Sequence, residues 1–330
     1  MSSTEPSSDP RIYRVGWICA NRKAEYMVAL AMLDELHSNP LQVLGNVNTY
    51  MLGELHGHNV VVCYPKDPDQ VVPTPFHARM MLEEFKTIQH VLLVGIGQGV
   101  PMQNNEDTDI RLGDVVIAIQ ESEVIYLNDQ FRSTSVKNLA DEALRSAANQ
   151  FLTEYKKSQG DTLGKNMLKT WKHMPSKSSL FRWPDICEDY LFNSAYEHVE
   201  FVRHEDSRDP CESCDRDELV CRKKQRCELL PRIHSGVVAS LNYPLRDART
   251  RDRMVEMHKK IRCLDMKSAQ IANAVGGLVI RGISGYADSH QNEKWQGLAA
   301  LAAATCASWL LSCLPKAAAS KDLVGNAGTI

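Results

Sequence analysis

Residues 277–289 read Gly-Leu-Val-Ile-Arg-Gly-Ile-Ser-Gly-Tyr-Ala-Asp-Ser, an apolar run that ends in a turn of small residues. The run predicts a buried strand, and the polar residues after it predict the start of a helix. Open α/β sheets place their ligand crevice where a strand delivers polar residues from its carboxyl end, just before a helix. The turn at Ser284 and Gly285 is therefore the first candidate for a functional site.

Length and composition indicate a globular protein. The chain has 330 residues, of which 43% are hydrophobic, enough to bury the core of one large or two modest domains. A net charge of -3 gives no long-range attraction to nucleic acid or anionic lipid. Residues 1–10 are polar and lack the regions of a secretion signal, so we expect a cytoplasmic protein with its ten cysteines reduced.

The uncharged segment 297–314 is long enough to be mistaken for a membrane span. Six of its residues are alanine, and the polar residues 293–296 resemble the first turn of the same helix. We expect a buried helix packed against a sheet and no contact with a membrane.

Apolar runs alternate with helical spacing along the chain, which predicts a layered α/β domain. Residues 25–37 have the apolar spacing of a helix. Strands are expected at residues 13–20, 59–64, 90–95, 114–120, 233–240 and 277–283.

A basic helix is expected at residues 246–260. Its six Arg and Lys residues are balanced by Asp247, Asp252 and Glu256, which indicates a salt-bridged surface and no nucleic-acid partner.

The apolar periodicity weakens between about residues 158 and 232, which predicts an insertion within a domain of residues 11–318. Residues 1–10 are expected to be disordered, and residues 319–330 to form a loose tail. The insertion is cysteine-rich at residues 211–227. Cys211 and Cys214 form a CxxC pair, and Cys221 and Cys227 follow at wider spacing. These four could hold a structural zinc, the one cofactor the sequence suggests, or remain unligated thiols.

Residues 91–101 predict a strand that runs into Gly95, Gly97 and Gly99. Such a loop lets backbone N–H groups approach an anion, although a simple tight turn fits equally well. The spacing differs from the dinucleotide fingerprint. Two further strands have polar ends. Asp109-Ile-Arg111-Leu-Gly113-Asp114 precedes one, where its charges are expected to pair with each other, and Asn242 follows the other.

Five segments, taken in order, resemble the purine nucleoside phosphorylase and nucleosidase superfamily, in particular its fungal branch that often precedes receptor-like multidomain proteins. The segments are Tyr13-Arg-Val-Gly-Trp-Ile-Cys-Ala20, Ala24-Glu25-Tyr26 with Met32-Leu-Asp-Glu-Leu-His37, Val94-Gly-Ile-Gly-Gln-Gly-Val-Pro101, Asp109-Ile-Arg-Leu-Gly-Asp-Val-Val116, and Ile280-Arg-Gly-Ile283 through Asp288-Ser-His290.

The resemblance implies a nucleoside phosphorylase-like α/β fold, with a central mixed twisted sheet that curls toward a barrel and is flanked by helices. It also implies a nucleoside pocket at the strand ends, cleavage of an N-glycosidic bond with phosphate or water, and a homo-oligomer, either a dimer or a trimer. Sugar-side contacts are implied for Gly95, Gly97, Gln98 and Gly99, where Gln98 replaces a frequent glycine. Arg111 and Asn242 are further ligand-binding candidates.

The resemblance gives three catalytic candidates: Glu25, Ser284 and Asp288. Glu25 matches the glutamate that activates water.

The resemblance also gives ligand-binding candidates. Met266 matches the methionine under the ribose. Lys267 stands where the family has a glutamate for the sugar hydroxyls, which favours an anionic ligand. Gly285 stands where an aspartate protonates the purine, leaving Ser284 and Asp288 as substitute candidates. Asp288 is more simply explained as the cap of the final helix.

Losing the general acid slows such a reaction by about 10²- to 10⁴-fold. We therefore expect standard N-glycosidic cleavage to be lost and the pocket to be an enzyme site for another small molecule, anionic or nucleoside-like. Two alternatives remain: a pseudoenzyme that binds a nucleotide-like ligand or a protein partner, and an active purine nucleosidase or phosphorylase that uses Glu25 with an unrecognised proton donor.

Overall fold

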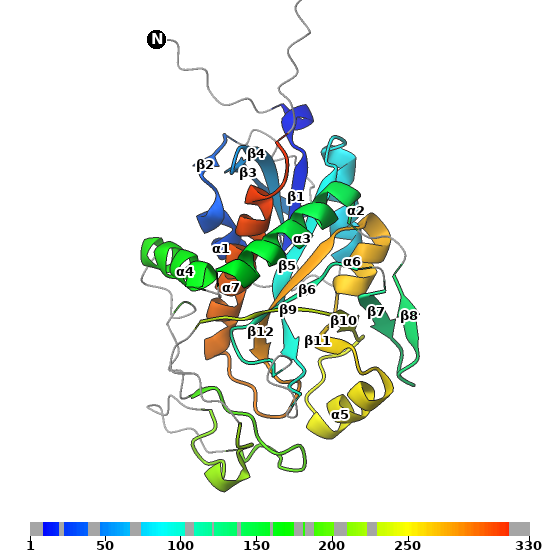
Figure 1. Ribbon diagram of the computed structural model, residues 1–330. Coiled ribbons are helices and arrows are strands. Elements are labelled where there is room, and N and C mark those ends of the chain that lie inside the picture. Colours follow the sequence, from blue (N-terminus) through cyan, green and yellow to red (C-terminus); the bar gives the residue numbers. More distant parts are fainter. Residues whose placement is uncertain are drawn as a thin grey trace, which may run out of the picture.

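A single mixed sheet of twelve strands organises the computed structural model (Figure 1). The structure describes residues 9–19, 23–38, 47–66, 74–102, 109–120, 122–136, 140–158, 161–174, 181, 188–200, 210–222 and 230–316. The strands are β1 (Val15–Cys19), β2 (Glu35–Leu36), β3 (Asn48–Leu55), β4 (His58–Pro65), β5 (His90–Gly99), β6 (Val115–Ala118), β7 (Val124–Leu127), β8 (Ser133–Ser135), β9 (Ile233–Ser235), β10 (Val237–Ser240), β11 (Ile261–Asp265) and β12 (Leu278–Gly285).

Strand β5 is the point where the sheet branches. It pairs in parallel with β1 and with β12, and its last residues pair antiparallel with β11. The main path runs β2-β3-β4-β1-β5-β11-β10-β7-β8, while β12 connects β5 to β6 and β9. The sheet is mixed, twisted and not closed, which confirms the predicted fold class. Three strands therefore meet at the end of β5.

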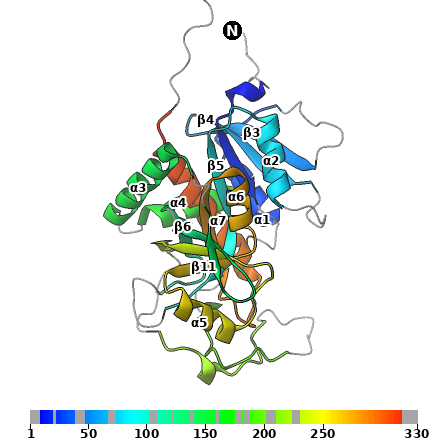
Figure 2. The same ribbon diagram turned by 90° about the vertical axis from the view of Figure 1, so that its right-hand side faces the viewer.

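Seven α-helices cover the sheet in the described part of the chain. Helix α7 packs against α1, α3 and α4, and α2 packs against α6. Figure 2 shows α3 and α4 on one side of the molecule and α2 and α6 on the other. The helices are α1 (Lys23–Met32), α2 (Thr74–Glu84), α3 (Glu142–Lys157), α4 (Asp161–His173), α5 (Ala248–Met257), α6 (Ser268–Val275) and α7 (Lys294–Ser312).

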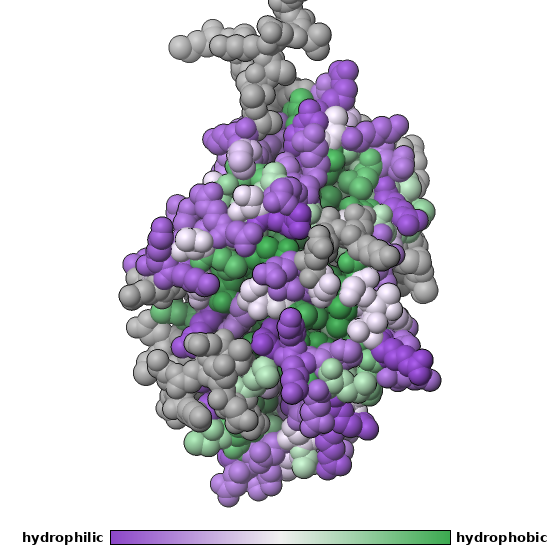
Figure 3. Space-filling model, turned by 45° about the vertical axis from the view of Figure 1, so that its right-hand side comes forward, coloured by the Kyte–Doolittle hydropathy of each residue, from purple (hydrophilic) through white to green (hydrophobic). Residues whose placement is uncertain are grey.

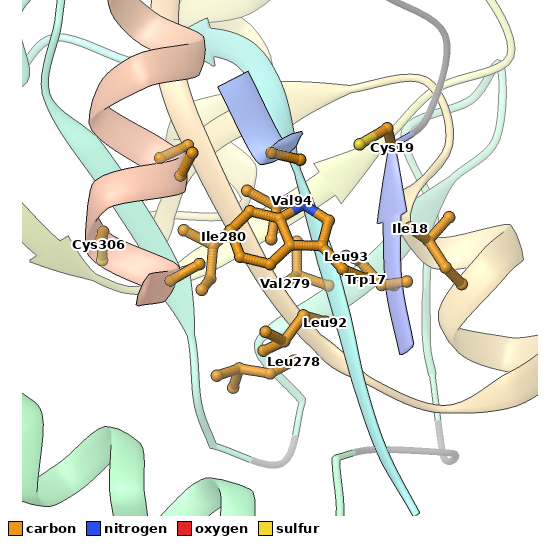
Figure 4. Close-up of a cluster of buried hydrophobic side chains, with 14 of the residues drawn as sticks. Trp17, Ile18, Cys19, Leu92, Leu93, Val94, Leu278, Val279, Ile280 and Cys306 are labelled. Carbon is orange, nitrogen blue, oxygen red and sulfur yellow. The ribbon is translucent and has the colours of Figure 1, made fainter. Parts of the chain in front are cut away.

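The core lies between the central strands and α7. Every residue of β1, β6, β10 and β12 is buried, as expected for strands covered on both faces. Trp17 of β1 is 1% exposed, and Figure 4 shows its indole among side chains of β5 and β12. The coloured surface in Figure 3 is mainly hydrophilic at its rim and lower end, and apolar residues lie toward the middle of the molecule. This core holds the strand ends that form the site.

Helix α7 contains the uncharged, alanine-rich segment. A Cβ on Gly282 of β12 would collide with the backbone of Ala299, so helix and strand touch backbone to backbone. Small residues are needed at such a contact, which explains the alanines. The predicted buried helix is confirmed, and no helix among the described residues is long and apolar enough to cross a membrane.

Three sequence-based predictions of elements were wrong. The single strand expected over residues 233–240 is two strands, β9 and β10, which pair with different neighbours. The helix expected over residues 25–37 ends at Met32, because Glu35 and Leu36 pair antiparallel with Gly53 and Glu54 of β3. The loop expected at Gly95, Gly97 and Gly99 is strand: β5 continues through Gly99, since β12 and β11 pair with it there. The glycines therefore make room for neighbouring side chains.

The segment expected to be an insertion divides into two parts. Helix α4 packs against α7 and so belongs to the helical layer. The described residues 188–200 and 210–222 lie apart, near α5 at the lower end of the molecule in Figure 1. They surround a small apolar cluster of Phe192, Cys211 and Cys214. Residues 1–8 and 317–330, which include the expected tail and most of the expected disordered N-terminus, lie outside the described residues.

Candidate active site

A cavity of about 530 Å³ lies where β5, β11 and β12 end. The register between β5 and β12 shifts after Ile283, so Ser284 is the extra residue of a β-bulge. Bulges re-aim side chains beside active sites. The cavity is lined by Glu25, Ile96, Gly97, Gln98, Leu241, Tyr243, Pro244, Leu245, Arg246, Leu264, Asp265, Met266, Lys267, Arg281, Ser284, Gln291, Asn292, Glu293 and Gln296.

Glu25 reaches the cavity from the first turn of α1. Its Oε1 accepts a hydrogen bond from the Ile96 N–H of β5 at 2.9 Å, which fixes the carboxylate. Glu25 is only 5% exposed, yet it lines the cavity. A Cβ on Gly95 would lie 2.5 Å from the same oxygen, so only glycine leaves room for the carboxylate. The structure thus holds Glu25 in a single position.

Arg281 of β12 faces Glu25 across Gly95. Its Nη1 lies 2.6 Å from the position of a Gly95 Cβ, and this nitrogen is buried without a hydrogen-bond partner among the described residues. Its Nε donates to Asp265 Oδ2 at 2.9 Å, which keeps the guanidinium in place. A carboxylate oxygen and an unused N–H donor therefore converge beside the cavity, an arrangement that can orient a water molecule.

Asp265 holds Arg281 in place, and both of its carboxylate oxygens are occupied by hydrogen bonds. Its oxygens accept hydrogen bonds from Ser240 Oγ, Ser268 Oγ and Arg281 Nε. The sequence analysis missed both Asp265 and Arg281 as site residues. The available signal was the charge of Arg281 within an otherwise apolar, fully buried strand, because buried charges need partners.

Gln98 and Gly285 are coupled across the bulge. A Cβ on Gly285 would collide with Gln98 Oε1, which accepts a hydrogen bond from the Ala287 N–H at 3.2 Å. The Gln98 side chain therefore fills the place into which a side chain at position 285 would project. An amide can donate a hydrogen bond there, but it cannot supply a proton as a carboxylic acid does.

Met266 and Lys267 also line the cavity. Lys267 is the N-cap residue of α6, and Met266 is 40% exposed. The charges around the cavity balance, since three carboxylates face three cations. They are Glu25, Asp265, Glu293, Arg246, Lys267 and Arg281. Any preference for an anion is therefore local to Lys267 and not a property of the whole cavity.

The two substitute acids lie in different places. Ser284 lines the cavity, and its Oγ donates to the Gly97 carbonyl at 3.3 Å. Asp288 is 3% exposed and is not among the lining residues. Burial raises the pKa of Asp288 to about 6, while nearby Arg251 opposes the rise. The expectation that Asp288 caps α7 was wrong: it accepts from the His290 N–H at 3.0 Å, and the N-cap of α7 is Glu293.

Several ligand-binding candidates lie outside the lining. Arg111 pairs with Asp109 at 2.8 Å, so the expected pairing of charges before β6 is present. Asn242 donates to the Tyr126 hydroxyl on the exposed side of the strand ends. Gly97 lines the cavity. Gly95 and Gly285 border it through lining side chains, which are Glu25 and Arg281 at Gly95 and Gln98 at Gly285. The side chains next to Gly99 are not among the lining residues.

The expected zinc ligands are only partly brought together. Cys211 and Cys214 are buried in one turn, whereas Cys221 is exposed, and Cys227 lies outside the described residues. On helix α5, Arg251 is bound to Asp252 at 2.7 Å, but Arg251 is buried and does not lie on the expected surface.

Solved structures with the same fold are nucleosidases. No protein-family model matches the chain. The 5′-methylthioadenosine/S-adenosylhomocysteine nucleosidase of Neisseria meningitidis superposes with a TM-score of 0.54, at 13% identity, over 91% of this chain and 98% of that one. The enzyme of Colwellia psychrerythraea gives 0.55, at 14% identity, over 93% and 97%. The futalosine hydrolase of Helicobacter pylori gives 0.53, at 15% identity, over 91% and 97%. The chain therefore has the same fold as these enzymes.

A fungal protein is similar in sequence as well. A nucleotide-binding leucine-rich repeat (NLR)-like protein of Hyaloscypha variabilis is 32% identical over 316 residues, which cover 93% of this chain. The matched region is 30% of that protein's length, so this chain corresponds to under a third of its relative. The match supports the resemblance to the fungal branch.

Proposed function

We propose that the cavity is a hydrolytic site for a nucleoside-like small molecule, in which Glu25 and Arg281 hold the attacking water. The observation that supports this most directly is the convergence of Glu25 Oε1 and the unpartnered Arg281 Nη1 at Gly95. The arginine donates to the water oxygen, and the carboxylate accepts a water proton as the oxygen attacks the sugar carbon. The glycosidic C–N bond breaks, and its electron pair leaves with the base.

The departing base defines the substrate class. A neutral purine leaves as an anion unless a general acid protonates it, and Gln98 occupies the place of such an acid. A base that carries a positive charge in the substrate leaves as a neutral molecule and needs no acid. We therefore expect the site to favour N-glycosides with cationic or otherwise stable leaving groups, and Lys267 to contact an anionic substituent on the sugar side.

Guanosine and 7-methylguanosine form a matched pair of probes, because the methylated base carries the charge that removes the need for an acid. We expect 7-methylguanosine, or its 5′-phosphate, to be hydrolysed at least about 10²-fold faster than guanosine. The variant Glu25→Gln should lose this hydrolysis while still binding both probes. Equal rates for the two nucleosides would contradict the proposed substrate class.

A second candidate function is binding without chemistry. The filling of the acid position by Gln98, together with Lys267 at the position expected to contact the sugar hydroxyls, favours it. It predicts thermal stabilisation by nucleosides or nucleotides with no base released over hours, in both the wild type and Glu25→Gln.

A further inference from the structure

A group of side chains of the metal-binding types lies outside the cavity, where residues 188–200 and 210–222 meet the loop between β12 and α7. The ligand atoms of His198, Cys214 and His290 all lie within 4.8 Å of one another. Three side chains from three separate segments therefore converge on one point. Cys211 lies beside them, because its Sγ is 3.9 Å from His198 Nδ1.

The two distances from His198 Nδ1 to cysteine sulfur atoms are close to the ligand–ligand distance of a tetrahedral zinc site. His198 Nδ1 lies 3.3 Å from Cys214 Sγ and 3.9 Å from Cys211 Sγ. Zinc bonds of about 2.3 Å to sulfur and about 2.1 Å to nitrogen place two ligands of a tetrahedron about 3.6 Å apart. The two observed separations lie on either side of that value.

His290 is the residue whose surroundings most require a partner. It is 8% exposed, and neither ring nitrogen has a hydrogen-bond partner among the described residues. Its ring stacks on Phe192 at 4.1 Å and meets His198 edge-on. A buried polar group without a hydrogen-bond partner destabilises the folded state. A metal ion at this point would give one of the nitrogens its missing partner.

The backbone already supports such a site. The Cys214 N–H donates to the Cys211 carbonyl at 3.1 Å, forming the turn that a CxxC pair makes around zinc. The His198 N–H donates to Ser289 Oγ at 2.9 Å, which holds His198 beside His290. Two thiolates and two neutral imidazoles would balance the charge of Zn²⁺, and binding would release two thiol protons.

We propose that His198, Cys211, Cys214 and His290 bind one structural zinc ion. This ligand set replaces Cys221 and Cys227 of the sequence-based hypothesis with two histidines. The ion would join residues 188–200 and 210–222, whose apolar cluster is small, to the loop after β12. Gln291, Asn292 and Glu293 of the same loop line the cavity, so the zinc would also fix one cavity wall.

The wild-type chain provides the first test. The full chain, purified under reducing conditions without chelators, should contain one zinc ion per molecule by mass spectrometry of its metals. Replacement by Co²⁺ should give tetrahedral absorption, with thiolate charge-transfer intensity for two sulfurs. A folded, reduced chain that holds no metal after titration with Zn²⁺ or Co²⁺ would overturn the proposal, and so would a Cys211–Cys214 disulfide in the fresh protein or intensity for four sulfurs.

Single variants test the ligand set. Cys214→Ser and His290→Gln should lose bound zinc, and Cys221→Ser is the matched control that should retain it. Loss of zinc from Cys221→Ser to the same extent as from Cys214→Ser would contradict the assignment. If Cys214→Ser fails to fold, the cobalt spectra of the wild type and of Cys221→Ser decide instead. These readouts measure metal alone, so they do not depend on the proposed hydrolysis.

Discussion

Gln98 and Gly285 share one space: the amide of Gln98 lies where a side chain on Gly285 would begin. The relationship follows from the bulge at Ser284: Gln98 pairs with Gly285, whereas an unshifted register would pair Gln98 with Ser284. Positions 98 and 285 are therefore coupled in one part of the cavity. Gly285→Asp alone should create a steric conflict, whereas Gln98→Gly alone should leave a space.

The first prediction measures this coupling. Gly285→Asp should displace Gln98 and break its hydrogen bond with the Ala287 N–H, while Gln98→Gly should leave a space. In a double-mutant cycle, we expect the free energy of unfolding of the double variant to be about 1 kcal/mol higher than the two single changes predict when they are added. Urea unfolding of the wild type, both single variants and the double variant measures it. Strict additivity would contradict the shared space.

The second prediction concerns the ion pair that holds Arg281. Arg281→Met leaves Asp265 buried without its cation, so the free energy of unfolding should fall by about 3 kcal/mol or more. Adding Asp265→Asn removes the unpaired charge and should recover part of the loss. Chemical denaturation of the two variants tests this, and an Arg281→Met protein as stable as the wild type would show that the pair carries no such role.

The third prediction concerns the contact between β12 and α7. Gly282→Ala places a methyl group against the backbone of Ala299, which cannot move without shifting the helix. We expect a loss of about 3 kcal/mol. Gly164→Ala is the control, because its Cβ meets only the end of the flexible Leu230 side chain, and alanine favours the helix. It should change the stability by less than about 1 kcal/mol. Thermal unfolding distinguishes the two, and equal effects would argue against the close contact.

The sequence was informative where the pattern was local. The apolar run of residues 277–283 and the alanine-rich segment after it predicted β12 and α7, because each pattern extends over a whole element. The resemblance added Glu25, Gln98, Met266, Lys267 and Ser284, which the structure places around one cavity.

Features that depend on contacts between distant segments were not predicted. The glycines of β5 suggest a loop when taken alone, and only pairing with β11 and β12 makes them strand. Arg281 needed its partner Asp265 from another strand before its role was visible. Likewise, His290 joins Cys214 only through the fold, whereas Cys221, which is near Cys214 in sequence, is exposed.

The most direct test of the central claim, that the water-holding half of the site is intact, is base release from inosine by the variant Gln98→Gly/Lys267→Glu/Gly285→Asp. This variant restores the acid and the sugar-binding carboxylate together. We expect release at least about 10²-fold faster than in the wild type, and its loss when Glu25→Gln is added. A folded triple variant that binds inosine but releases no base would contradict the claim that Glu25 and Arg281 form a working site.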